Sequence, residues 1–175
     1  MESVPVLPQM VKGSIQMRRI GGFGFPVEAM VDENGVLAHL GRDSSLWIFF
    51  GPGRKVRLSD GTEWRIKSTT SGRHIVPIIT SDSGTVAVSG PLFAKRSYGI
   101  NLRGHAYTLI PLGHVGLRRP GLWSLRRHED QIAAVEDHDR TIHAAEPIPI
   151  GAALLVFTLI THGIPGEGDL TPKRD

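Results

Sequence analysis

A run of basic side chains with no acidic neighbour has the clearest chemical potential in this sequence. Between Asp82 and Glu129 the chain contains no aspartate or glutamate. Guanidinium groups pair with phosphate through two parallel hydrogen bonds, and a tryptophan among them can stack or enter a lipid interface. We therefore predict an anion-binding or lipid-binding surface; the alternative is a set of solvated turn residues. The residues of this predicted surface are Lys95, Arg96, Arg103, Arg118, Arg119, Trp123, Arg126 and Arg127.

A stretch rich in carboxylates and histidines follows. Imidazole and carboxylate groups together can hold a divalent metal, and strand alternation places residues two apart on one face. No spacing in this stretch matches a known metal motif, and the carboxylates can instead pair with the nearby arginines. We therefore predict no metal site and no cofactor. The residues concerned are His128, Glu129, Asp130, Glu136, Asp137, His138, Asp139, His143 and Glu146.

No catalytic arrangement stands out in the sequence. The Gly-x-Ser-x-Gly elbow of α/β-hydrolases is absent, and no cysteine is present, which excludes thiol catalysis, disulfides and Cys-based metal sites. Ser81 or Ser83 can be combined with distant histidines into a catalytic triad, but the same is true of any chain with eight histidines. We expect a non-enzymatic protein. A small hydrolase or a metal-dependent enzyme is an alternative, because a site assembled from distant residues is invisible in one sequence.

Short β-strands must position these residues. Alternating apolar and polar residues between turn residues predict about ten to twelve strands, spaced roughly ten residues apart. The clearest hairpin joins residues 55–58 and 62–67 across Asp60 and Gly61. Neighbouring hairpin ends of a meander lie close together, so we expect Arg103, Arg118 and Arg127 to share a rim. The other expected strands are residues 14–20, 27–31, 36–40, 47–50, 73–80, 85–89, 98–102, 106–110, 122–126, 131–135 and 141–144.

The last apolar run, residues 148–163, carries no charge and is apolar on every face. A helix without a polar face must be enclosed, either by lipid or by protein. A membrane span needs about 20 apolar residues, whereas this run is shorter and lacks flanking basic and aromatic anchors. We predict a helix over residues 149–162 that is buried in protein. The alternative is a tail anchor that holds a cytosolic β domain on a membrane.

The size of a helix narrows the fold. With its side chains a helix is about 10 Å across, which is too wide for the space between two packed sheets. A closed barrel of about a dozen strands has a wide enough interior. We therefore predict a mainly β protein, a closed antiparallel barrel of about twelve strands around a C-terminal apolar helix. Residues 1–13 would form a loose lead-in, residues 14–164 a single domain and residues 165–175 a disordered tail.

The order of these features resembles the tubby C-terminal-like superfamily, in particular its LURP-one-related and phospholipid-scramblase-like branch. The resemblance spans roughly residues 14 to 163. It implies a twelve-stranded barrel around a central apolar helix and, since the best understood members bind phosphoinositides, a lipid ligand. The phosphoinositide-contacting residues of tubby proteins are not matched to positions in this sequence. The features that carry the resemblance are the turn 32–35, the hairpin 56–64, the pairs 98–102 with 107–111 and 123–126 with 131–135, and the proline-led helix through 154–157.

Composition sets the remaining expectations. A net charge of +3 and 6% aromatic residues give little reason to expect nucleic acid as a partner. No signal peptide is visible at the start, so we expect a cytoplasmic protein that is peripheral at the inner membrane surface when bound. We predict a binding or scaffold module that docks on anionic phospholipid or phosphoinositide through the basic surface. The sequence identifies no protein partner.

Overall fold

The computed structural model describes residues 9–21, 27–41, 53–71, 74–91, 97–112 and 121–162. Within these ranges the chain forms twelve strands and then one helix, α2 (Ile150–His162). The strands are β1 (Met10–Gly21), β2 (Val27–Asp32), β3 (Gly35–Leu40), β4 (Arg54–Leu58), β5 (Glu63–Ser71), β6 (His74–Ser81), β7 (Gly84–Pro91), β8 (Tyr98–Leu102), β9 (His105–Leu112), β10 (Leu122–Arg127), β11 (Asp130–Glu136) and β12 (Thr141–Pro149).

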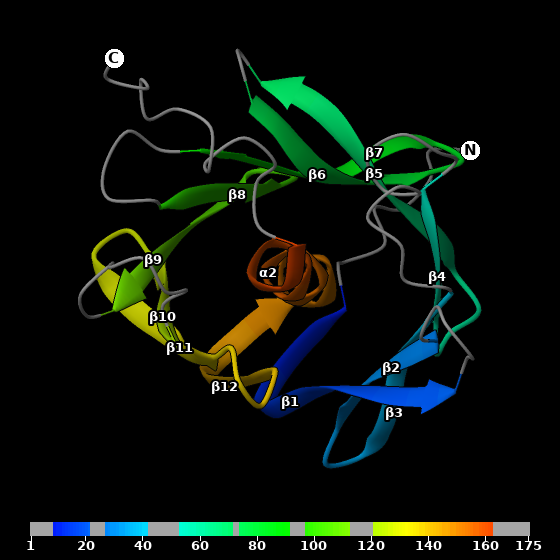
Figure 1. Ribbon diagram of the computed structural model, residues 1–175, viewed down its shortest axis with the longest axis horizontal. Helices are drawn as coiled ribbons and strands as arrows, with labels where there is room; N and C mark the ends of the chain where they lie inside the picture. The colour runs from blue at the N-terminus through cyan, green and yellow to red at the C-terminus, as the bar shows by residue number, and fades with distance from the viewer. Residues whose placement is uncertain are drawn as a thin grey trace, which may run out of the picture.

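The strands close into an antiparallel barrel with α2 in its interior (Figure 1). Each strand pairs with the next one in the chain, and β12 pairs with β1 to complete the ring. Closure removes the unpaired edges that an open sheet would present to other chains. The predicted fold class, a closed antiparallel barrel around a C-terminal apolar helix, is confirmed.

Strands β1 and β12 are longer than the sequence pattern predicts. Exposed Glu146 and Pro147 interrupt the apolar alternation of β12, yet the strand continues because its end pairs with the start of β1 through Met10 and Pro149. A bulge next to Gly13, whose φ is +88°, bends β1 to keep this pairing. The expected lead-in is therefore strand from Met10 onward. The expected strand 47–50 and tail 165–175 lie outside the described residues.

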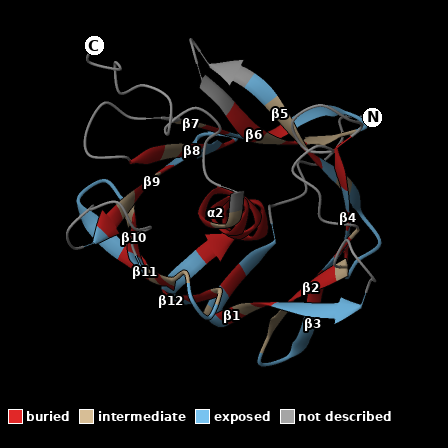
Figure 2. Ribbon diagram, viewed as in Figure 1, coloured by how far each residue is buried: buried red, intermediate tan, exposed pale blue. Residues whose placement is uncertain are grey.

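Helix α2 is enclosed by protein, as predicted. Its residues from Gly151 to Ile160 are all buried, and Figure 2 shows the helix at the centre of the ring of strands. Burying one large apolar side chain contributes about 1.5–3 kcal/mol, so the helix is a main source of core stability. Thr158 satisfies its hydroxyl in these surroundings by donating to the carbonyl oxygen of Leu154 at 2.8 Å.

The length of α2 is also informative. The helix has 13 residues. In the part of the chain that the structure describes, no helix is both long enough and apolar enough to cross a lipid bilayer.

Antiparallel pairing places successive connections at alternate ends of the barrel. We call one end the turn end; it carries the tight turns after β2, β4, β6, β8 and β10 and the start of α2. The opposite end, the loop end, carries the last residues of β1, β3, β5, β7, β9 and β11, the first residues of the strands that follow them, and the end of α2. The helix therefore enters at the turn end and runs back through the interior towards the loop end.

Removing one leucine from α2 tests whether the helix supports the barrel. We expect Leu155→Ala, at a fully buried position, to lower the free energy of unfolding by about 2–5 kcal/mol. The same change at Leu122, which is 49% exposed on β10, should cost about 1 kcal/mol or less. Urea unfolding of both variants measures the difference, and equal small losses would show that α2 is not the core.

Candidate functional site

The structure describes four of the eight residues of the predicted basic surface, Arg103, Trp123, Arg126 and Arg127. Arg103 lies in the turn after β8, and Arg126 and Arg127 lie at the end of β10, so all three belong to the turn end. Lys95, Arg96, Arg118 and Arg119 lie outside the described residues. In the sequence the first two join β7 to β8 and the others join β9 to β10, and the strand ends that they join lie at the loop end. Of the expected rim of Arg103, Arg118 and Arg127, the first and the last lie at the turn end, and Arg118 lies outside the described residues.

Trp123 does not belong to an exposed binding surface. Its side chain is 6% exposed and belongs to the hydrophobic core, with its ring centroid 5.9 Å from that of Tyr98. Among the described residues its indole N–H has no hydrogen-bond partner. The register of β10 turns this ring inward, so it is not available for stacking on a ligand or entering a lipid interface.

The arginines at the end of β10 already have partners. Arg127 Nη2 lies 2.5 Å from Glu146 Oε2, and Arg126 Nε donates to Ser124 Oγ at 3.3 Å. Glu146 of the acidic stretch thus neutralises Arg127 of the basic one. This is the kind of pairing that the sequence offered as the alternative to a metal site. His143 Nε2 and Glu136 Oε2 are 3.3 Å apart, and across the described ranges no three histidine or carboxylate groups gather as metal ligands would.

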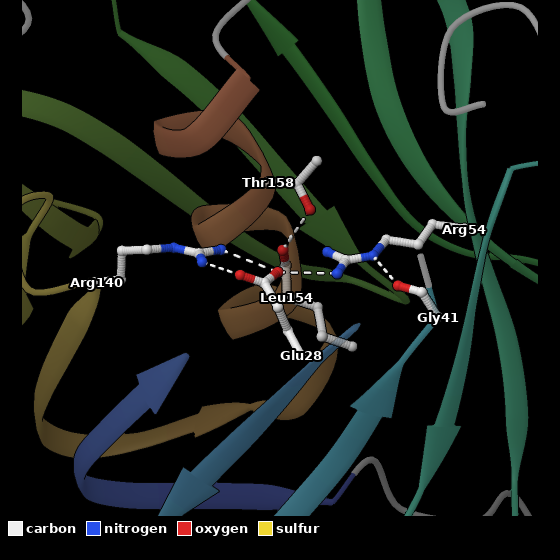
Figure 3. Close-up of polar contacts among 6 residues, drawn as sticks. All are labelled: Glu28, Gly41, Arg54, Arg140, Leu154 and Thr158. Carbon is white, nitrogen blue, oxygen red and sulfur yellow. Dashed lines mark hydrogen bonds and ion pairs between the residues drawn. The ribbon is translucent and has the colours of Figure 1, made fainter. Parts of the chain in front are cut away.

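A buried charge cluster near the loop end was missed in the sequence. Figure 3 shows the Glu28 carboxylate between the guanidinium groups of Arg54 and Arg140. Arg54 Nη2 donates to Glu28 Oε2 at 2.8 Å, and its Nε donates to the carbonyl oxygen of Gly41 at 2.8 Å. Arg140 donates to both carboxylate oxygens. Glu28 and Arg54 are only 2% and 4% exposed, so this pair is shielded from water, whereas Arg140 is 25% exposed.

This cluster joins strands β2 and β4 to the turn before β12, and it lies beside α2. Glu28 comes from β2 and Arg54 from β4, Arg140 directly precedes β12, and both arginines line a space beside Thr158 on α2. That space has no room for a water molecule, so the cluster is packed rather than open to a ligand. The role of the cluster is to hold the loop end of the barrel in register.

The turn end contains an open cavity of about 260 Å³. Its floor consists of apolar side chains from the strands and the first turn of α2, including Leu58, Trp64 and Leu102. Its rim carries polar groups, among them Arg103. Thr62, through its backbone N–H and its hydroxyl, donates to the rim carboxylate of Asp60 and holds the pKa of that group below its usual value. Asp60 is therefore charged at neutral pH.

The sequence carries no signal for this cavity, because its residues come from turns and strands spread along the chain. Motifs that denote ligand sites are local, whereas this cavity forms only when the barrel closes. Comparison of the chain with protein-family models, curated proteins and solved structures gave no match. Membership of the tubby C-terminal-like superfamily therefore stays a proposal that rests on the order of the elements.

The buried cluster predicts a large difference between two glutamates. We expect Glu28→Gln to lower the free energy of unfolding by about 3 kcal/mol, because it removes the buried negative charge that lies between two guanidinium groups. Glu146→Gln removes the ion pair with Arg127, in which both partners are about half exposed, and should change stability far less. Chemical denaturation measures both; similar losses would contradict the structural role of Glu28.

Proposed function

We propose that this protein is a non-enzymatic binding module that docks on anionic phospholipid through the loop end of its barrel. The proposal keeps the ligand class expected from the sequence and moves the docking surface to one end. The observation that carries it is the excess of carboxylates in the hairpin turns of the opposite end; exposed apolar side chains lie near both ends, with Met10 and Val36 near the turn end. A cytoplasmic location, peripheral at the membrane when bound, belongs to the same proposal.

The turn end is unsuited to an anionic surface. Its hairpin turns carry more carboxylates than cationic groups, and one of the two arginines among them, Arg127, is paired with Glu146. An anionic bilayer would repel this end at close range. The carboxylates of these turns are Asp32, Glu33, Asp60, Asp82, Glu129 and Asp130, and the arginines are Arg103 and Arg127.

The loop end carries exposed apolar side chains among the described residues. Ile20 is 54% exposed near the end of β1, and Leu112 and Leu122 are 37% and 49% exposed. Leu112 and Leu122 are directly opposite each other where β9 and β10 reach this end. Exposed apolar groups beside cations are typical of surfaces that enter a lipid interface. Arg18 and Arg19, also exposed, precede Ile20 on β1.

The composition of the connections outside the described ranges also favours docking through the loop end. The described strand ends that they join lie at the loop end. These connections hold every phenylalanine except Phe157, as well as Trp47, and aromatic rings favour the membrane interface. The described connection 137–140 adds two aspartates and Arg140. The charged residues in the connections outside the described ranges are Arg42, Asp43, Arg73, Lys95, Arg96, Arg118 and Arg119.

The expected strength of docking is moderate. Each basic residue close to an anionic membrane contributes about 1 kcal/mol, so several together give reversible recruitment that weakens with salt. The packed Glu28 cluster directly below this end supplies a rigid base. The resemblance to proteins that bind phosphoinositides supports the same ligand class.

Charge reversal at each end of the barrel tests the proposal. We expect the wild type to sediment with phosphatidylcholine vesicles only when they also contain phosphatidylserine or a phosphoinositide. Arg118→Glu with Arg119→Glu should weaken this binding by about tenfold or more, since two favourable contributions are lost. Arg103→Glu with Arg127→Glu changes the net charge equally at the turn end and should have little effect.

Two results of this assay would contradict the proposal. Equal binding of the wild type to neutral and anionic vesicles at low salt would remove the electrostatic basis. An equal loss in both double variants would show that net charge, rather than the loop end, determines binding. Thermal unfolding of the variants, compared with wild type, controls for misfolding.

A further inference from the structure

The cavity at the turn end lies at the opposite end from the proposed docking surface. Its volume of about 260 Å³ corresponds to about nine liquid water molecules. This size is near the lower limit of pockets that hold small organic ligands. An apolar floor with a few polar groups at the rim is also the usual construction of such pockets.

The floor is preformed by tight packing around Gly151. A Cβ atom on this glycine would lie 2.7 Å from Leu102 Cδ2 and 3.8 Å from Trp64 Cζ3, so the first turn of α2 already touches both side chains. The floor therefore has little freedom to collapse into the cavity. Trp64 is partly buried at the edge of the core and offers flat apolar area to a ring of similar size.

Among its described residues the rim carries one cation, Arg103, that can pair with an anionic group beside the charged carboxylate of Asp60. Asp60 already accepts hydrogen bonds from Thr62, whereas Arg103 has no hydrogen bond or ion pair with the residues that the structure describes. The hydroxyl groups of Ser81 and Ser83 also line the cavity; they hydrogen-bond to each other, and that of Ser81 donates to the carbonyl oxygen of Gly84. The first turn of α2 faces the same space, and the positive end of its dipole adds to the field of Arg103.

The position of Arg103 is fixed by its turn. Arg103 and Gly104 connect β8 to β9 and have φ values of +43° and +90°. Positive φ at both central residues is the geometry of the type I′ turn, which matches the twist of paired strands. The turn therefore holds the backbone of Arg103 at the cavity rim, and only its side chain has to move to reach a ligand.

We propose that this cavity binds a small organic anion, a carboxylate or phosphate monoester carried on a flat apolar ring. The ring packs against Trp64 and the apolar floor, and the anionic group pairs with Arg103, which can form two parallel hydrogen bonds with it. The proposal is independent of lipid docking, because the two surfaces share no residue.

Titration of the ¹⁵N-labelled full chain with benzoate, phenyl phosphate and benzamide tests the proposal by NMR. We expect either anion to shift the indole N–H of Trp64 and the amides of Gly104 and Gly151. Benzamide has nearly the same shape as benzoate but no charge, so it should bind about tenfold more weakly or worse. The tighter of the two anions identifies the preferred anionic group.

The Arg103→Asn variant removes the ion pair with the ligand and retains the fold. Asparagine tolerates positive φ, and Asn-Gly is a preferred type I′ pair, so the hairpin should be retained. We expect this variant to bind the anions about tenfold more weakly, close to the level of benzamide. The matched control, Arg127→Gln, removes one positive charge at the same end outside the cavity and should bind as the wild type does.

One set of titration results supports the anion site, and another contradicts it. Loss of anion binding in Arg103→Asn, with shifts confined to the cavity in wild type and control, supports the site. The proposal is overturned if neither anion shifts Trp64 and Gly151, or if Arg103→Asn binds as tightly as the wild type.

Discussion

The absence of a polar face on α2 is the constraint on which the rest of this structure depends. A helix that is apolar all round has to be surrounded, and in this protein a ring of twelve described strands surrounds it. The fit is close: Gly151 and the alanines after it bring the helix backbone near the wall, and Phe157 fills the space further along. The same enclosure makes the two ends of the barrel different, because α2 starts at one end and finishes at the other.

The two ends of the barrel differ in chemistry as a consequence of this arrangement. Near the end of α2, the wall contains a buried carboxylate and two guanidinium groups, which join β2 and β4 to the turn before β12. At the start of α2, the strands and tight turns leave an open cavity. Antiparallel alternation assigns every connection to one of these ends. We propose a membrane-facing role for one end and a ligand-binding role for the other.

Much of the fold could be predicted because its signals are local. Strand alternation, turn residues such as Asp60 and Gly61, and the uninterrupted apolar run each specify an element within a few residues, and helix width then requires a barrel. The end of β12 was missed because Glu146 and Pro147 look like a loop. Only the partner strand β1 shows why pairing continues to Pro149.

The candidate sites were much less predictable, because they depend on register and closure. Of the basic stripe in the sequence, the described members Arg103, Arg126 and Arg127 lie at the turn end, and Trp123 faces inward because of its place on β10. Glu28 is surrounded by apolar residues in the sequence, but its partners Arg54 and Arg140 are 26 and 112 residues away. No local pattern connects such groups.

Native-state hydrogen exchange tests the enclosure of α2 most directly. If the helix is the core of the barrel, the amides of Leu154 to Ile160 exchange only when the whole barrel unfolds, with the same free energy and denaturant dependence as the most protected strand amides. If these helix amides exchange much faster while the strands stay protected, the barrel stands without its helix. That result would contradict the role of α2 as the core around which the strands close.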